Sequence, residues 1–413
     1  MQRRLSDLCV PISDFHHPIS DCGPLAADCS PPAPTFILSV CPLGVKNQPR
    51  HMAIARTTYI DRIRIILTTL VIFHHTAIVY GGSGGWYWKE AKDSSSMLLL
   101  FFNAINQSYF MGFFFLLSGY FVPAAYDRKG AGKFLADRLV RLGIPLVVYF
   151  FLISPMTIAI ARTADGHPFW AGWWQMFQGR EFGPGPLWFA EALLIFALTY
   201  VVWRMIRPNP AAEPPKFPDH SALLFWAVVA AVVSFAVRFI VPVGENVLFL
   251  QLGYFPPYIV LFIAGCLAWR GGWFEQVTGR RLTPWAFGAV VATVMLPVAI
   301  FTFPPGDFHG GWSLKAAFYA LWDPILGWGM ILGYLWFFQK FLSGPSRLVD
   351  WTVRRAYGAY IVHPPVLVGL CVLAHAWVAP QLLKFLVVGA AACLGSWAVA
   401  SVLLLLPGSR RVL

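Results

Sequence analysis

The chain has 413 residues, of which 58% are hydrophobic and only 12% are charged, and its mean hydropathy is +0.62. A soluble protein of this length needs more charge to cover its surface, so the composition excludes that class. The net charge of +12 comes without a basic run suited to RNA or DNA. We therefore expect a helical membrane protein that binds no nucleic acid.

The first 51 residues differ from the rest. They hold four of the seven cysteines and interrupt their apolar runs with proline and aspartate, unlike a signal peptide. Two interpretations stay open: a disordered tail, or translation that starts at Met52. We favour the second. The other cysteines, Cys266, Cys371 and Cys393, are isolated, so we expect neither a disulfide framework nor a metal site.

Residues 52–413 read as one membrane domain. It contains ten stretches of about twenty apolar residues, each long enough to cross roughly 30 Å of hydrocarbon. The connections alternate in charge: the start and every second connection hold 20 Lys and Arg, and the others hold 6. The positive-inside rule then predicts an all-α protein with both termini cytoplasmic. The predicted spans are 60–80, 98–123, 138–161, 186–206, 221–241, 254–270, 283–303, 315–341, 357–378 and 384–407.

The first span carries ionisable groups near both ends. In "RIRIILTTLVIFHH" (62–75), Arg64 and His75 are eleven residues apart. That spacing is about 16 Å and close to three turns, so both lie on nearly the same helix face. Ionisable groups within a bilayer are costly and usually functional. The structural alternative is an arginine that reaches the interface and a histidine that bonds a neighbouring helix.

Later spans add further polar residues, and the topology predicts two layers. Arginines at the cytoplasmic mouth suit a phosphorylated ligand, because the guanidinium fork matches phosphate geometry. An outer histidine near a carboxylate suits general-base chemistry. The inner layer is expected to hold Arg64, Ser118, Arg138, Arg141 and His363, and the outer layer His75, Glu191, Asp323 and Arg238.

These residues resemble the acyltransferase-3 family of integral membrane acyltransferases. "YIDRIRIILTTLVIFHH" (59–75) is similar to that family's first span, in which a basic residue is followed after ten residues by histidine. Tyr120 replaces a phenylalanine of the second motif, and the resemblance extends from Tyr59 to about residue 405. The later motifs, in the family's order, are "FFFLLSGY" (113–120), "RLVRLGIP" (138–145), "LWF" (187–189) and "YIVHPPVL" (360–367).

The resemblance implies a reaction and its setting. An acetyl or succinyl group would move from cytoplasmic acyl-CoA to a hydroxyl of a carbohydrate at the outer face of the bacterial inner membrane. Acyl-CoA is then a substrate, and no permanently bound cofactor is expected. The Gly-Tyr-Phe at 119–121 also occurs in the branch that succinylates periplasmic glucans.

The resemblance also implies roles for the site residues. Arg64 and His75 would form the catalytic pair, with His75 taking the proton from the acceptor hydroxyl. Glu191 would orient His75 or bind the sugar, and the sequence leaves both open. The coenzyme A contacts expected at the inner mouth are Arg138, Arg141, Ser118 and His363.

A proton-coupled transporter or exporter is the alternative function, because it would also keep His, Glu and Asp inside its spans. Against it, the chain has no internal repeat of the kind that marks many secondary transporters. Two aromatic clusters in outer connections, "GWYW" (85–88) and "FWAGWW" (169–174), either stack on sugars or form an interfacial belt. The belt is the commoner use.

Overall fold

The computed structural model describes residues 50–90, 96–208 and 213–413, with side chains from residue 58. The interpretation of residues 1–51 falls outside this part, apart from the first two residues of α1. All the regular elements described are helical. They are α1 (Arg50–Val79), α2 (Met97–Arg138), α3 (Ile144–Val148), α4 (Ser154–Thr163), α5 (Phe169–Gly179), α6 (Trp188–Ile206), α7 (His220–Ile240), α8 (Phe255–Gly271), α9 (Gly279–Thr302), α10 (Leu314–Phe341), α11 (Arg347–Leu373), α12 (Gln381–Leu403) and α13 (Ser409–Val412), with short 3₁₀ turns at Gly185–Leu187, Leu252–Tyr254 and Phe274–Gln276.

Among the described residues, eight helical runs are long and apolar enough to cross a membrane. One of them, Met97–Thr163, takes in two predicted spans, and its backbone leaves helical geometry at Gly130 (φ 71°, ψ 167°). A positive φ of this kind favours glycine. α10 covers the predicted span 315–341. The chain is therefore a multi-pass, all-α membrane protein, while the count of ten spans and the cytoplasmic termini stay predictions.

Two π-helical segments, η1 (Leu139–Gly143) and η2 (Tyr149–Ile153), interrupt the second half of that run. Pro145 is the second residue after η1 and has no N–H to give to the carbonyl of Arg141. The hydroxyl of Tyr357 on α11 donates to that carbonyl instead, at 2.9 Å. A neighbouring helix thus supplies the hydrogen bond that the carbonyl of Arg141 lacks within its own helix, as a membrane interior requires.

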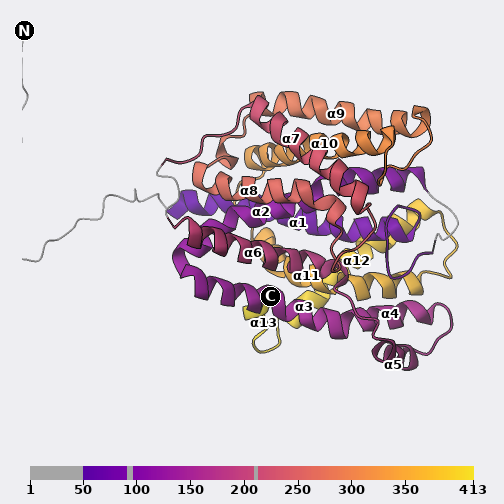
Figure 1. The fold of residues 1–413 in the computed structure, drawn as a ribbon. Coiled ribbons are helices and arrows are strands. Elements are labelled where there is room, and N and C mark those ends of the chain that lie inside the picture. The colour runs from indigo at the N-terminus through magenta and orange to yellow at the C-terminus, as the bar shows by residue number, and fades with distance from the viewer. Residues whose placement is uncertain (1–49, 91–95, 209–212) are drawn as a thin grey trace, which may run out of the picture. The chain divides into compact units, whose positions relative to one another are not determined.

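The helices run side by side, with α1 and α2 between a group formed by α7, α9 and α10 and a group formed by α3 and α4 (Figure 1). α2 packs along α8, α9 along α10 and α11 along α12. Glycines permit the close approach of α2 and α8: an added Cβ at Gly119 would collide with the carbonyl of Phe262, and one at Gly265 with the carbonyl of Leu116. The Ser-Gly motif at 118–119 therefore has a packing role.

Candidate active site

A cavity of about 1170 Å³ lies where α1 ends and α2 begins. This is slightly above the usual volume of small-molecule sites. Many lining residues are aromatic or carry neutral polar groups. This composition suits a ligand that has both apolar ring faces and hydroxyl groups. They come from residues 71–78 of α1, 83–87 of the following loop, 97–111 of α2, 154–158 of α4, the segments 181–188 and 243–258, and positions between 296 and 319, together with Tyr360.

His75 reaches this cavity from α1 and lies against two further rings. Its centroid is 3.9 Å from Trp86, with 17° between the planes, and 5.4 Å from His363, with 15°. Three ring nitrogens in this cluster are buried without a hydrogen-bond partner: Nδ1 of His75, Nε1 of Trp86 and Nε2 of His363. Buried polar atoms in proteins are normally paired. The cluster is therefore a candidate site for a polar group of a ligand.

The expected separation of His363 from His75 into two layers is wrong, since their rings are in contact. The cause is the extent of α11. This helix begins at Arg347, ten residues before the predicted start, and ends at Leu373 instead of 378. His363 is therefore nearer the outer end of its helix than the predicted bounds placed it. Its expected contact with coenzyme A stays a prediction.

The neighbouring His74 has a different environment. Its ring stacks on Phe110 with centroids 5.0 Å apart. The side-chain amide nitrogen of Asn103 lies 3.3 Å from Nε2 and that of Asn106 lies 3.2 Å from Nδ1. Both asparagines are buried on α2. His74 thus ties α1 to α2, and of the two adjacent histidines His75 is the one with a free buried nitrogen.

The loop after α1 carries Trp86 and is fixed at both sides. The hydroxyls of Tyr87 and Tyr149 are 2.8 Å apart. Burial raises the pKa of Tyr87, so its phenol is a neutral hydrogen-bonding group at the cavity. Glu90 accepts at 2.6 Å from Nζ of Lys384, whose side chain is 4% exposed. These contacts hold Trp86 over His75.

We expect Glu90→Gln to lower the free energy of unfolding by about 1.5–3 kcal/mol, the range for a hydrogen bond to a charged group. The substitution keeps an oxygen acceptor but leaves the buried Lys384 charge without a counter-ion. Denaturant or thermal unfolding in detergent measures the loss. The matched control is Glu181→Gln, which breaks an exposed pair with Arg162 and should cost little. If Glu90→Gln lowers the free energy of unfolding as little as Glu181→Gln does, the Glu90 pair does not stabilise the loop.

The other expected site residues lie apart from this cluster. The side chain of Arg64 is 43% exposed and lies 3.4 Å from Asp61. Arg141 is 3.6 Å from Asp137, and Arg138 lies over the ring of Phe134. Two predicted residues, Ser118 and Glu191, are half-buried. None of Arg64, Arg138, Arg141, Ser118 and Glu191 lines the cavity.

Two residues of the expected outer layer pair with each other. Arg238 of α7 donates to Asp323 of α10 at 2.9 Å, and their side chains are 1% and 4% exposed. Arg238 also donates to the carbonyl of Gly253. Its guanidinium lies 4.9 Å from the ring centroid of Tyr319 and 5.5 Å from that of Tyr254. Both tyrosines line the cavity, so this pair supports its wall.

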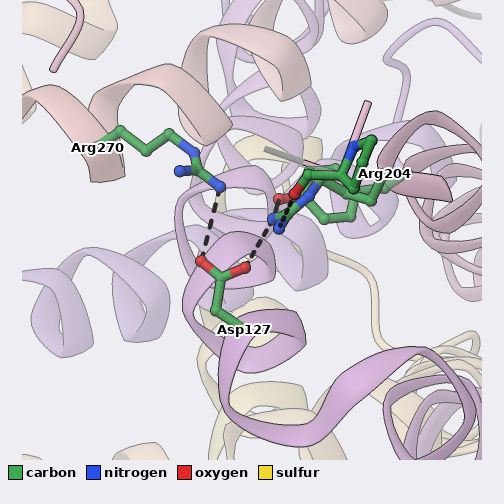
Figure 2. Close-up of polar contacts among 5 residues, drawn as sticks. Asp127, Arg204 and Arg270 are labelled. Carbon is green, nitrogen blue, oxygen red and sulfur yellow. Dashed lines mark hydrogen bonds and ion pairs between the residues drawn. The ribbon is translucent and has the colours of Figure 1, made fainter. Parts of the chain in front are cut away.

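A second ion-pair network joins the far ends of helices that reach the cavity. Figure 2 shows Asp127 of α2 between two guanidiniums, Arg204 of α6 at 2.6 Å and Arg270 of α8 at 3.6 Å. Arg204 is buried and also donates a hydrogen bond to the hydroxyl oxygen of Tyr200 at 3.3 Å. One carboxylate therefore connects three helices on the side away from the cavity.

Several of these residues escaped sequence analysis. Asn103 and Asn106 are three residues apart in an apolar stretch, and that spacing could have indicated a buried polar contact. Trp86 belongs to a cluster for which an interfacial belt was favoured. The structure divides the two clusters, because Trp86 lines the cavity whereas Trp170 and Trp174 are 73% and 61% exposed.

Comparison with known families decides the class of the protein. A family model described as an acyltransferase domain matches residues 57–401, more than four fifths of the chain. The chain belongs to the acyltransferase-3 family. No match was found among curated proteins or among solved structures. The matched residues of this acyltransferase-3 chain include His75 and its cavity, and it is a membrane acyltransferase that works within a lipid bilayer.

Proposed function

We propose that the protein is an O-acyltransferase that moves an acetyl or succinyl group from cytoplasmic acyl-CoA to a hydroxyl of an extracytoplasmic carbohydrate. The observation that carries this proposal is the position of His75, which lines a large, mainly apolar cavity rich in aromatic rings and has a buried nitrogen without a partner. The distribution of Lys and Arg favours the outer face for this cavity. The family resemblance favours the bacterial inner membrane for the protein.

In the proposed reaction His75 acts as general base. It takes the proton of the acceptor hydroxyl as that oxygen attacks the thioester carbonyl. The C–S bond then breaks, and His75 returns the proton to the departing coenzyme A thiolate. The coenzyme A phosphates bind on the cytoplasmic side to Arg64, Arg138 and Arg141, with Ser118 beside them.

The cavity supports a carbohydrate as the acceptor. Aromatic rings such as those of Trp86, Trp188 and Tyr258 can stack on the apolar faces of sugars. Neutral hydrogen-bonding groups, among them Gln107 and Asn246, also line it and can pair with hydroxyls. This mixture supports a polyol, rather than a purely apolar molecule, as the proposed acceptor.

The competing function is proton-coupled transport. A transporter would use a buried His and Asp for proton movement, but in this structure Asp323 is already paired with Arg238 at 2.9 Å. The family match also favours an acyltransferase.

The decisive experiment is incubation of the purified protein with labelled acetyl-CoA or succinyl-CoA and a mixture of glycans. We expect label in the glycan fraction and free coenzyme A in equal amount, because each transfer releases one thiol. A His75→Ala preparation is the control for uncatalysed acylation. Release of coenzyme A without labelled glycan would contradict the proposed acceptor, and no turnover of either donor would contradict the proposed reaction.

A further inference from the structure

His363 is followed by two prolines in the middle of α11, and the first of them sets its hydrogen bonding. In a regular helix the carbonyl of Tyr360 would accept from the N–H of residue 364, which is a proline and has none. Nδ1 of His363 lies 2.6 Å from that carbonyl oxygen. A carbonyl only accepts, so Nδ1 carries the proton. Nε2 of the neutral ring then presents a lone pair.

Three ring distances locate His363 relative to His75. The centroids are separated by 3.9 Å for His75 and Trp86, 5.4 Å for His75 and His363, and 5.9 Å for Trp86 and His363. A triangle with these sides has an angle of about 77° at His75. Trp86 stacks on the His75 ring, and His363 lies to the side of that stack rather than above it. All three planes are within 17° of each other in pairs.

This side-by-side arrangement with nearly parallel planes is compatible with a hydrogen bond between the two imidazoles. An in-plane N–H···N bond of about 3 Å between such rings places their centroids about 5 Å apart, given the ring radius. The two unpartnered buried nitrogens are complementary, since Nε2 of His363 is an acceptor and Nδ1 of His75 carries a proton in one of its two neutral forms. Contacts of this kind often tighten only when substrates bind.

We propose that His363 is a positioning residue for His75, accepting at Nε2 a hydrogen bond from Nδ1–H of His75. The bond selects the form of His75 whose other nitrogen, Nε2, has its lone pair free for the acceptor hydroxyl. This assignment rests on the proposed function, and it gives His363 the orienting role that was one of the two left open for Glu191 by the sequence. Trp86 covers the pair on one face and keeps water from competing for the bond.

The first test does not depend on turnover. Diethyl pyrocarbonate modifies a histidine nitrogen that has a free lone pair, and peptide mass spectrometry of the full-length protein follows this reaction at His75. His363→Phe keeps a ring but removes the acceptor, and should slow modification of His75 about tenfold, by analogy with the lower end of the loss on removing the hydrogen-bond partner of a metal-bound histidine. His363→Gln places an amide oxygen near the position of Nε2 and should restore the wild-type rate.

The second test uses acyl transfer. We expect His363→Phe to lower kcat about 10–100-fold while the KM for acyl-CoA changes less than about threefold, because the bond acts on the base and not on donor binding. His363→Gln should recover most of the rate. The control is Leu367→Ala, a fully buried position one turn further along α11, which should lower stability without lowering kcat.

The outcomes separate the two hypotheses. Equal modification of His75 in the wild type and in His363→Phe would overturn the pairing whatever the activity. A His363→Gln variant no better than His363→Phe would overturn it as well, since ring shape alone would then matter. If modification depends on His363 but the wild type transfers no acyl group, the pairing stands and the proposed function fails.

Discussion

Replacing His75 with alanine should lower the rate of acyl transfer by about 10²–10⁴-fold, the contribution of a positioned general base. His75 lines the cavity, so its loss removes the group that takes the acceptor proton. Binding of acyl-CoA should stay nearly unchanged, because a base acts in the chemical step. Steady-state transfer of labelled acyl groups and calorimetric titration with acyl-CoA measure the two effects separately.

The comparison variants are Arg64→Ala and Arg141→Ala, on the cytoplasmic side where coenzyme A is proposed to bind. Each should weaken acyl-CoA binding by about 1–3 kcal/mol, the loss expected for a charge-assisted contact. Their kcat at saturating donor should remain close to that of the wild type. If all three variants lose binding equally and keep the same kcat, then His75 has no distinct chemical role and the division between the two mouths is wrong.

Replacing Asp323 with alanine should destabilise the protein by about 3–5 kcal/mol, because it leaves Arg238 as an uncompensated buried charge. The Arg238 side chain is 1% exposed, so water does not screen it in place. The tyrosines over its guanidinium line the cavity, so a shift there should also raise the KM for the acceptor. Unfolding in detergent and acceptor titration measure both effects.

Two further variants test the cause of that loss. Arg238→Met combined with Asp323→Leu removes both charges and keeps the volume, and should recover most of the stability. Asp127→Ala removes the partner of both Arg204 and Arg270, and should cost less because the carboxylate is 44% exposed and water can reach the pair. A double variant as unstable as Asp323→Ala would indicate that packing, and not the unpaired charge, is responsible.

The spans could be predicted because they depend on local composition alone. Length and hydropathy located α6 to α10 within about four residues at each end, whereas α1 and α11 begin ten residues before the predicted spans and α5 was not predicted. The motif in α1 pointed to His75, which lines the cavity. α10 shows the limit of such rules: it covers a predicted span, yet it is not among the eight runs that meet the hydropathy criterion. Trp and Tyr in this helix score low on such scales although they pack well in a bundle.

The composition of the site could not be predicted because distant segments form it. Trp86 lies over His75 through a loop fixed by Lys384, which is 294 residues from its partner Glu90. The prediction placed His363 too near the cytoplasmic end of its helix. The predicted span began after the basic pair at 354–355, whereas α11 continues back to Arg347. Basic residues mark the membrane surface and not the start of a helix, so they do not show where a residue lies between the two ends of its helix.

The π segment η2 has a consequence for the rotational phase of the chain. The buried positions run Leu142, Pro145 and Tyr149 at the usual spacing, and the next, Ser154, follows after five residues. The extra residue turns everything after it by about 100° relative to a continuous α-helix. Ser154 and Ile158 line the cavity only in this phase. Loss of one residue from 149–153 would leave a regular helix of sufficient length, but one that turns this wall of the cavity toward the lipid.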